Sequence, residues 1–193
     1  MEAVIVFFYA TAGFALLFLL WSILMFNALV RLRQHCRESW AGIDTELKRR
    51  YDLVPNLVDT VKGYAAHERE VLRSVSEARS RAVASTGSPA TQAADENLFV
   101  GALTGLLAVV ENYPDLKASD HFLELQRELS NTEDRIQAAR RFYNGNVRDL
   151  NTRVEAFPSN LVAALFRFKQ EEFFKIADVA VRAAPQAGFE RAP

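Results

Sequence analysis

The sequence predicts an all-α protein in which an N-terminal transmembrane helix continues into an antiparallel bundle of three long helices plus a short C-terminal helix. Two observations predict this class. An apolar run occupies residues 3–30, and apolar residues recur at helical spacing through almost all of the remaining chain, without strand-like alternation. The predicted organisation is a transmembrane anchor over residues 1–30, a helical bundle over residues 31–180 and a flexible tail over residues 181–193.

The anchor is predicted from length and from the absence of charge. Residues 3–30 carry no charged side chain, and 24 of these 28 residues are apolar. As a helix the run spans about 42 Å, more than the roughly 30 Å of a bilayer's hydrocarbon core. A secretory signal peptide would have a shorter apolar region after a basic leader, whereas Glu2 precedes this run. We therefore expect an uncleaved single span.

The flanks of the span predict its orientation. Arg31, Arg33 and Arg37 follow it, and only Glu2 precedes it. The positive-inside rule then places the N-terminus outside and the C-terminal bundle in the cytoplasm. All 23 basic residues and 23 of the 24 acidic ones lie after the span, so the bundle is electrically balanced. This balance gives no support to nucleic-acid binding.

The first bundle helix is predicted from about Ser39 to Val83. Apolar residues follow heptad spacing from Trp40 to Ala82, as in a helix that packs against partner helices or in a coiled coil. Pro55 lies inside this segment and is expected to kink it, because proline removes a backbone donor. Since no Gly or Pro occurs in residues 14–41, we expect the anchor to continue directly into this helix.

Three more segments complete the predicted bundle. A loop is expected over residues 84–95, and a second helix over about residues 94–113. The third helix, over about residues 120–157, has apolar residues every seventh position: Phe122, Leu129, Ile136, Tyr143, Leu150 and Phe157. A final amphipathic helix is expected over about residues 161–178. The Phe-rich residues 157–174 predict either a lid over one end of the bundle, which we favour, or an exposed docking surface.

Polar residues interrupt or flank the predicted helix seams. Arg50 and Glu68 occupy core-type positions of the first helix, where a charge is costly unless it is paired. The candidate polar seam comprises Arg50, Asp52, Asn56, Glu68, Glu133, Arg140, Asn144 and Asn151. The first interpretation is a structural layer that sets helix register. The alternatives are a groove for a partner or ligand and, with less support, an enzyme site.

Motifs that carry chemistry are missing from the sequence. No Glu-x-x-His unit of a di-metal bundle is present, and neither is a Gly-x-Ser-x-Gly elbow or a Gly-rich phosphate loop. A surface metal contact through His121 and Glu124, or near His67, stays open as a weaker alternative. We therefore predict no catalytic residues, no cofactor, no metal and no nucleic-acid partner.

Several blocks of the sequence resemble one family. The first is LKRRYDLVPNLV at residues 47–58, preceded by Trp40 and Ile43-Asp44; the others include VKGY at 61–64, YPDLKA at 113–118 and FPSN at 157–160. In their order and spacing these blocks resemble the bacterial LemA family over about residues 31–174. The chain departs from the family's pattern at Arg167 and Gln170-Glu171.

The resemblance implies a location and a fold more than an activity. LemA-like proteins are single-span bacterial membrane proteins with a helical bundle, and a related group takes part in building magnetosome membranes. Together with the anchor, this predicts a non-enzymatic scaffold or adaptor at the bacterial cytoplasmic membrane, with a protein partner or a second copy of the chain. The alternative is a ligand- or stress-sensing module that regulates a neighbouring membrane protease or signalling protein.

Overall fold

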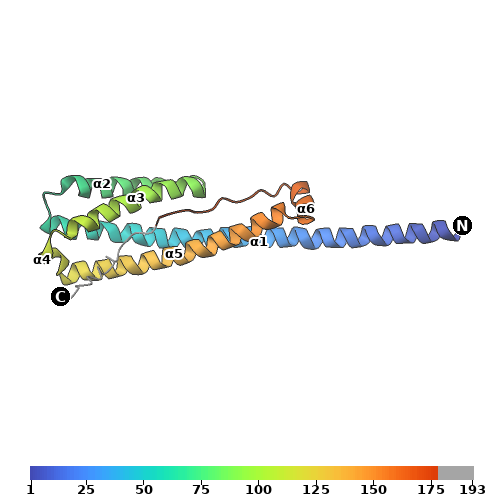
Figure 1. The fold of residues 1–193 in the computed structure, drawn as a ribbon, viewed down its shortest axis with the longest axis horizontal. Helices are drawn as coiled ribbons and strands as arrows, with labels where there is room; N and C mark the ends of the chain where they lie inside the picture. Colours follow the sequence, from blue (N-terminus) through green and yellow to red (C-terminus); the bar gives the residue numbers. More distant parts are fainter. Residues whose placement is uncertain (178–193) are drawn as a thin grey trace, which may run out of the picture. The chain divides into compact units, whose positions relative to one another are not determined.

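A computed structural model describes residues 1–177 of the chain. Within these residues the helices are α1 (Glu2–Tyr64), α2 (Arg69–Ala84), α3 (Pro89–Val110), α4 (Pro114–Lys117), α5 (Asp120–Glu155) and α6 (Ser159–Leu165), as drawn in Figure 1. All regular secondary structure in the described residues is helical, which confirms the predicted all-α class. The tail predicted over residues 181–193 lies outside the described part of the chain.

The chain divides into two compact units. Among the described residues, unit 1 comprises Met1–Gly42 and Arg141–Phe173, and unit 2 comprises Ile43–Arg140 and residues 174–177. Helices α1 and α5 therefore each contribute one part to unit 1 and the other part to unit 2. The helices α2, α3 and α4 belong to unit 2, and α6 belongs to unit 1.

Helix α1 is helical at every residue from Glu2 to Tyr64, so the apolar run continues into a bundle helix as predicted. By length and composition two helices of the described chain are apolar enough to cross a membrane, α1 and α3. The apolar window of α1 is wholly exposed in the structure, whereas that of α3 is partly buried and supplies core residues to unit 2. We therefore regard the apolar run of α1 as the candidate span and α3 as a core helix.

The helix continues through Pro55, and the structure shows how. In an α-helix the N–H of residue 55 would donate to the carbonyl oxygen of Tyr51, but proline has no N–H. The guanidinium of Arg79, on α2, donates from Nε to that carbonyl oxygen at 2.7 Å. A side chain from the neighbouring helix thus replaces the missing backbone donor.

The segment predicted as one helix from Ser39 to Val83 is two helices, so that prediction was wrong. Helix α1 ends at Tyr64, and α2 begins at Arg69 after a short turn. The N–H of Glu68 donates to the carbonyl of Ala65 at 3.1 Å, and Glu68 then serves as the N-cap residue of α2. Apolar spacing stays helical on both sides of the turn, so periodicity alone did not reveal the reversal.

The loop predicted over residues 84–95 is shorter than expected, because α3 begins at Pro89. The side chain of Ser88 caps this helix by accepting from the N–H of Thr91, and proline fits the first helical position. Asp95 therefore lies on α3, where it accepts from Nε of Arg81 at 2.6 Å and from the hydroxyl of Ser85 at 2.7 Å. These two bonds join the end of α2 to the start of α3.

The core of unit 2 is built from the apolar faces of its helices. The heptad face of α1 is buried as predicted from Ile43 to Val61. On α3 the buried face is Ala93, Glu96, Phe99, Val100, Leu103, Leu106 and Val110. Leu98, on the same helix, is exposed. The stripe of α5 supplies Phe122, Leu129 and Ile136.

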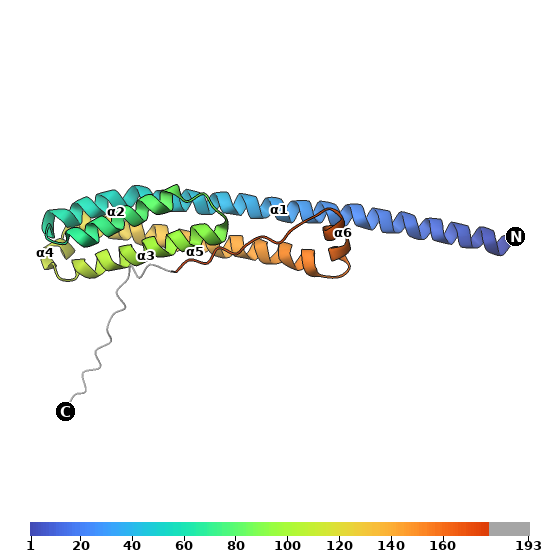
Figure 2. The same ribbon diagram turned by 90° about the horizontal axis from the view of Figure 1, so that it is seen from above.

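In unit 1 the C-terminal part of α5 runs antiparallel to α1, as Figure 2 shows. The rings of Trp40 and Tyr143 lie 5.2 Å apart between centroids, and Nδ2 of Asn146 donates to the hydroxyl of Ser39 at 3.1 Å. Tyr143 and Leu150 are buried as predicted, but Phe157 is 80% exposed, contrary to the seven-residue pattern.

The C-terminal amphipathic helix predicted over residues 161–178 is much shorter. Helix α6 ends at Leu165, and residues 168–177 are extended. Arg167 has a φ of 57°, a left-handed conformation that a right-handed helix does not accommodate. We call residues 168–177 the C-terminal strap.

Candidate functional site

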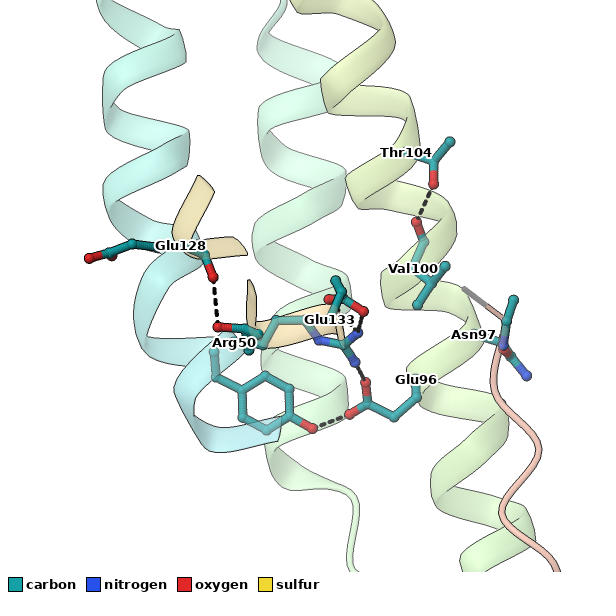
Figure 3. A network of polar contacts seen from close by, with 10 residues as sticks. Arg50, Glu96, Asn97, Val100, Thr104, Glu128 and Glu133 are labelled. Atoms are coloured by element: carbon teal, nitrogen blue, oxygen red, sulfur yellow. Dashed lines mark hydrogen bonds and ion pairs between the residues drawn. The ribbon is translucent and has the colours of Figure 1, made fainter. Parts of the chain in front are cut away.

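The main polar site of unit 2 is an ionic cluster of four side chains, Arg50, Tyr51, Glu96 and Glu133. Arg50 and Tyr51 lie on α1, Glu96 on α3 and Glu133 on α5. Figure 3 shows the guanidinium of Arg50 between the carboxylates of Glu96 and Glu133. Three helices that are distant in the sequence therefore meet at one charge.

Each charged group of the cluster has several partners. Nη1 of Arg50 donates to Oε1 of Glu133 at 3.0 Å and to Oε2 at 3.2 Å. Nη2 of Arg50 donates to Oε2 of Glu96, and the hydroxyl of Tyr51 donates to the other oxygen of Glu96. The guanidinium also lies over the ring of Phe99, 5.3 Å from its centroid, which favours a cation.

The three charged side chains of the cluster are closed to solvent, whereas Tyr51 is half-buried. Arg50 is 0% exposed, Glu96 2% and Glu133 4%. Burial, followed by the negative charge of Glu96, raises the pKa of Tyr51 above its ordinary value, so its hydroxyl stays protonated and can donate. A substrate or ligand would have to separate the helices to reach these groups. In such an arrangement a mismatch of helix register would leave a buried charge unpaired.

The structure does not bring the eight residues of the predicted polar seam together. Arg50 and Glu133 meet in the ionic cluster, but Asp52 and Asn56 are exposed on α1. Glu68 lies in the turn before α2, where it accepts from the hydroxyl of Tyr113 at 3.1 Å. Asn144 is half-buried on α5 in unit 1, whereas Arg140 belongs to unit 2.

Two of the remaining seam residues hold the C-terminal strap by its backbone. In unit 1 the side-chain amide of Asn151 donates to the carbonyl of Glu171 at 2.9 Å and accepts from the N–H of the same residue at 2.9 Å. The hydroxyl of Tyr143 donates to the next carbonyl, that of Glu172, at 2.9 Å. In unit 2 Nη1 of Arg140 donates to the carbonyl of Ile176.

Two residues with central roles, Glu96 and Asn97, were not predicted from the sequence. Glu96 completes the ionic cluster, and it lies three or four residues from Ala93, Phe99 and Val100 on the buried face of α3. That spacing was a signal that would have found it. Asn97 donates to the carbonyl of Lys175 at 3.2 Å and accepts from the N–H of Ala177 at 2.7 Å. Since an exposed asparagine is common, no sequence signal marks Asn97.

Metal ligands do not gather in the described part of the chain. Among residues 1–177 no group of three His, Cys, Asp or Glu side chains is placed to hold a metal ion. Cys36 is buried in unit 1 as a free thiol. Its burial, and then the negative charges of Glu171 and Asp149, raise its pKa to about 11, which disfavours the nucleophilic thiolate.

Comparison with known proteins identifies the family. A LemA family model matches residues 39–189. The magnetosome protein MamQ of Magnetospirillum gryphiswaldense is 24% identical over 177 residues, 79% of this chain and 65% of the relative, so the chain spans about two thirds of that protein. MamQ 2 of Paramagnetospirillum magneticum is 25% identical with the same coverage. Protein LemA of Metamycoplasma hominis is 27% identical over 154 residues, 79% of this chain and 70% of the relative. This chain belongs to the LemA family.

Proposed function

We propose that this protein is a non-enzymatic scaffold or adaptor, anchored in the cytoplasmic membrane by one span, with its bundle on the cytoplasmic side. It assembles with a second copy of itself or with another membrane protein. The observation that carries the proposal is the continuity of α1, which is helical from the apolar run to its last bundle residue, Tyr64. No loop separates the candidate span from the bundle helix within α1, so a partner bound to the bundle is held at the membrane.

The ionic cluster supports a structural role for the polar residues of the bundle. Because Arg50, Glu96 and Glu133 are buried and hydrogen-bonded to one another, they favour the helix register in which all three charges are paired. If the ionic cluster were the ligand site of the regulatory alternative, a ligand would have to separate these helices to reach it.

Exposed apolar side chains give the proposal a place to be tested. Phe142 on α5 is 66% exposed and Leu98 on α3 is 52% exposed. A partner that covered either side chain would bury apolar surface, which favours association. Two relatives are named as magnetosome proteins, which agrees with the resemblance to a related group that takes part in building magnetosome membranes.

The experiment is site-specific photocrosslinking of the full chain in native membranes. A photoreactive residue replaces Phe142 or Leu98, and the matched control replaces the exposed polar residue Arg135 on α5. We expect adducts with a second copy or with a defined membrane protein from the apolar sites, and few from the control. Monomers alone at both apolar sites would contradict the proposal.

A further inference from the structure

Unit 1 contains an open groove between α1 and α5 whose charged side chains are mostly basic. The groove has a volume of about 510 Å³ and is lined by Arg31 and His35 of α1 and by Arg148, Asp149, Thr152 and Arg153 of α5, among others. Its three arginines face a single aspartate. None of the three forms an ion pair with another residue in the described chain. They are therefore free to bind an anion from outside.

The groove lies at the end of the candidate span. Arg31 directly follows the last residue of the apolar run, and His35 lies four residues further on. A helix rises about 1.5 Å per residue, so Arg31 and His35 lie within about 8 Å of the end of that run. The headgroup region on each side of a bilayer is roughly 5–8 Å thick. With the end of the run at the hydrocarbon boundary, the basic groove is level with the phosphates of the leaflet on that side.

An apolar surface adjoins this level. Phe157, Leu161, Leu165 and Phe166, on α6 and beside it, are all at least half exposed. The ring of Phe26 contacts two rings at the C-terminal end: its centroid lies 4.7 Å from that of Phe166 and 5.7 Å from that of Phe168. Phe26 belongs to the apolar run, five residues before Arg31, so α6 reaches the depth of the last turn of the span. At that depth the acyl chains of the lipids would cover these apolar side chains.

We propose that unit 1 carries a lipid site, in which the basic groove binds the phosphate of an anionic phospholipid while the apolar side chains around α6 insert between neighbouring lipids. Guanidinium groups suit this ligand because they donate two hydrogen bonds to phosphate oxygens in parallel. The hydroxyl of Thr152 offers another donor. The three arginines and Asp149 together give a net charge of two positive, which selects anionic over zwitterionic lipids.

The site is tested first by lipid binding to the full chain in mild detergent. Native mass spectrometry measures adducts with phosphatidylglycerol and with phosphatidylcholine of the same acyl chains. The variant is R148Q/R153Q, and the matched control is R127Q/R135Q, which removes the same charge from exposed positions on the same helix. We expect phosphatidylglycerol to bind more tightly. R148Q/R153Q should weaken it roughly 25-fold, about fivefold per arginine, with little change in the control.

Two results would overturn the lipid site. One is equal binding of the two lipids, or equal loss in both variants, which would indicate non-specific charge. The other is displacement of phosphatidylglycerol by millimolar inorganic phosphate, which would indicate a site for the free anion.

The apolar half is tested in nanodiscs. An environment-sensitive fluorophore is attached at Leu165→Cys in a Cys36→Ala background. The control is Arg141→Cys, two residues from the Tyr143 that contacts Trp40, about 15 Å of helix beyond the span. We expect quenching by spin-labelled lipid at position 165 but not at 141, and equal quenching would overturn insertion. The inference rests on the proposed membrane anchor but not on the scaffold role. A chain that does not enter nanodiscs refutes the anchor. A chain that enters nanodiscs, but whose phosphatidylglycerol binding does not depend on Arg148 and Arg153, refutes only the lipid site.

Discussion

The substitution of Arg79 by methionine tests how α1 accommodates Pro55. Methionine keeps an apolar stem in place of the arginine stem but cannot donate to the carbonyl oxygen of Tyr51, which Arg79 contacts at 2.7 Å. A hydrogen bond from a charged donor contributes about 1.5–3 kcal/mol, and a carbonyl left unpaired in a buried place costs about 1–3 kcal/mol. Because Tyr51 and Arg79 are only half-buried, water replaces part of this bond. We therefore expect a loss of about 1–2 kcal/mol in the free energy of unfolding.

The substitution Pro55→Ala provides a sharper test of the role of Arg79. Alanine restores the N–H that donates to Tyr51 within the helix, so Arg79 is no longer needed for that carbonyl. In the Pro55→Ala background, Arg79→Met should lower the free energy of unfolding by less than about 0.5 kcal/mol. The difference from the loss in the native background gives a coupling of about 1 kcal/mol between the two sites. The matched control is Arg73→Met on the same helix, where an exposed ion pair with Glu77 at 3.6 Å contributes under about 0.5 kcal/mol.

Pulse proteolysis of the full chain in mild detergent, over a series of urea concentrations, measures these free energies of unfolding. Each variant is compared at the same detergent and lipid content. If Arg79→Met costs the same with Pro55 as with alanine at that position, Arg79 acts through general packing, and its role as the substitute donor is refuted.

Four further outcomes follow from the structure. Arg50→Met leaves two buried carboxylates without their cation and should lower the free energy of unfolding, measured by pulse proteolysis, by about 3–5 kcal/mol. In R50M/E96L/E133M the free energy of unfolding should return to within about 1 kcal/mol of the native value. A small effect of Arg50→Met alone would contradict the burial of the cluster. Asn151→Ala removes both bonds to Glu171, so tryptic cleavage after Lys169 should accelerate roughly 5- to 150-fold, and an unchanged rate would show that the strap is held elsewhere. The alkylation rate of Cys36, measured in its native fold, should keep rising to a pH of about 11, since burial raises its pKa, and a plateau near the ordinary value of 9.0 would contradict this. The hydroxyl of Ser85 and the guanidinium of Arg81 lower the pKa of Asp95, so the ionised carboxylate stabilises the fold above pH 3.8 and this effect is lost as the pH falls further. In Asp95→Asn the free energy of unfolding, measured by circular dichroism, should therefore fall less steeply on the acid side of its pH profile.

The features that the sequence predicted are those with a regular period. The heptad face from Ile43 to Val61 and the seven-residue stripe of α5 identified core positions, because burial repeats with the helix. Arg50 was also predictable, since a charge at a core position requires a partner. The partner itself was only half identified: Glu133 was in the predicted seam, and Glu96 was not.

The features that the sequence did not predict arise where the chain stops being periodic. The turn after Tyr64 contains no proline, and the only glycine near it, Gly63, lies inside α1, so apolar spacing suggested one continuous helix. The C-terminal strap contains enough phenylalanines to resemble an amphipathic helix, but its backbone bonds to Asn97 and Asn151 rather than to itself. Long-range bonds of this kind depend on which helices become neighbours, and local composition does not record that.

The way in which Asn97 holds the strap bears on how this segment can change during evolution. Its amide pairs with the carbonyl of Lys175 and the N–H of Ala177, which are backbone groups present in almost any residue. Replacement of an exposed strap residue such as Lys175 therefore leaves both bonds in place. One residue inserted between the two positions would displace the second bond by about 3.3 Å, beyond the reach of a single amide. We expect homologous chains to vary freely in the identity of exposed residues there while keeping the number of residues constant.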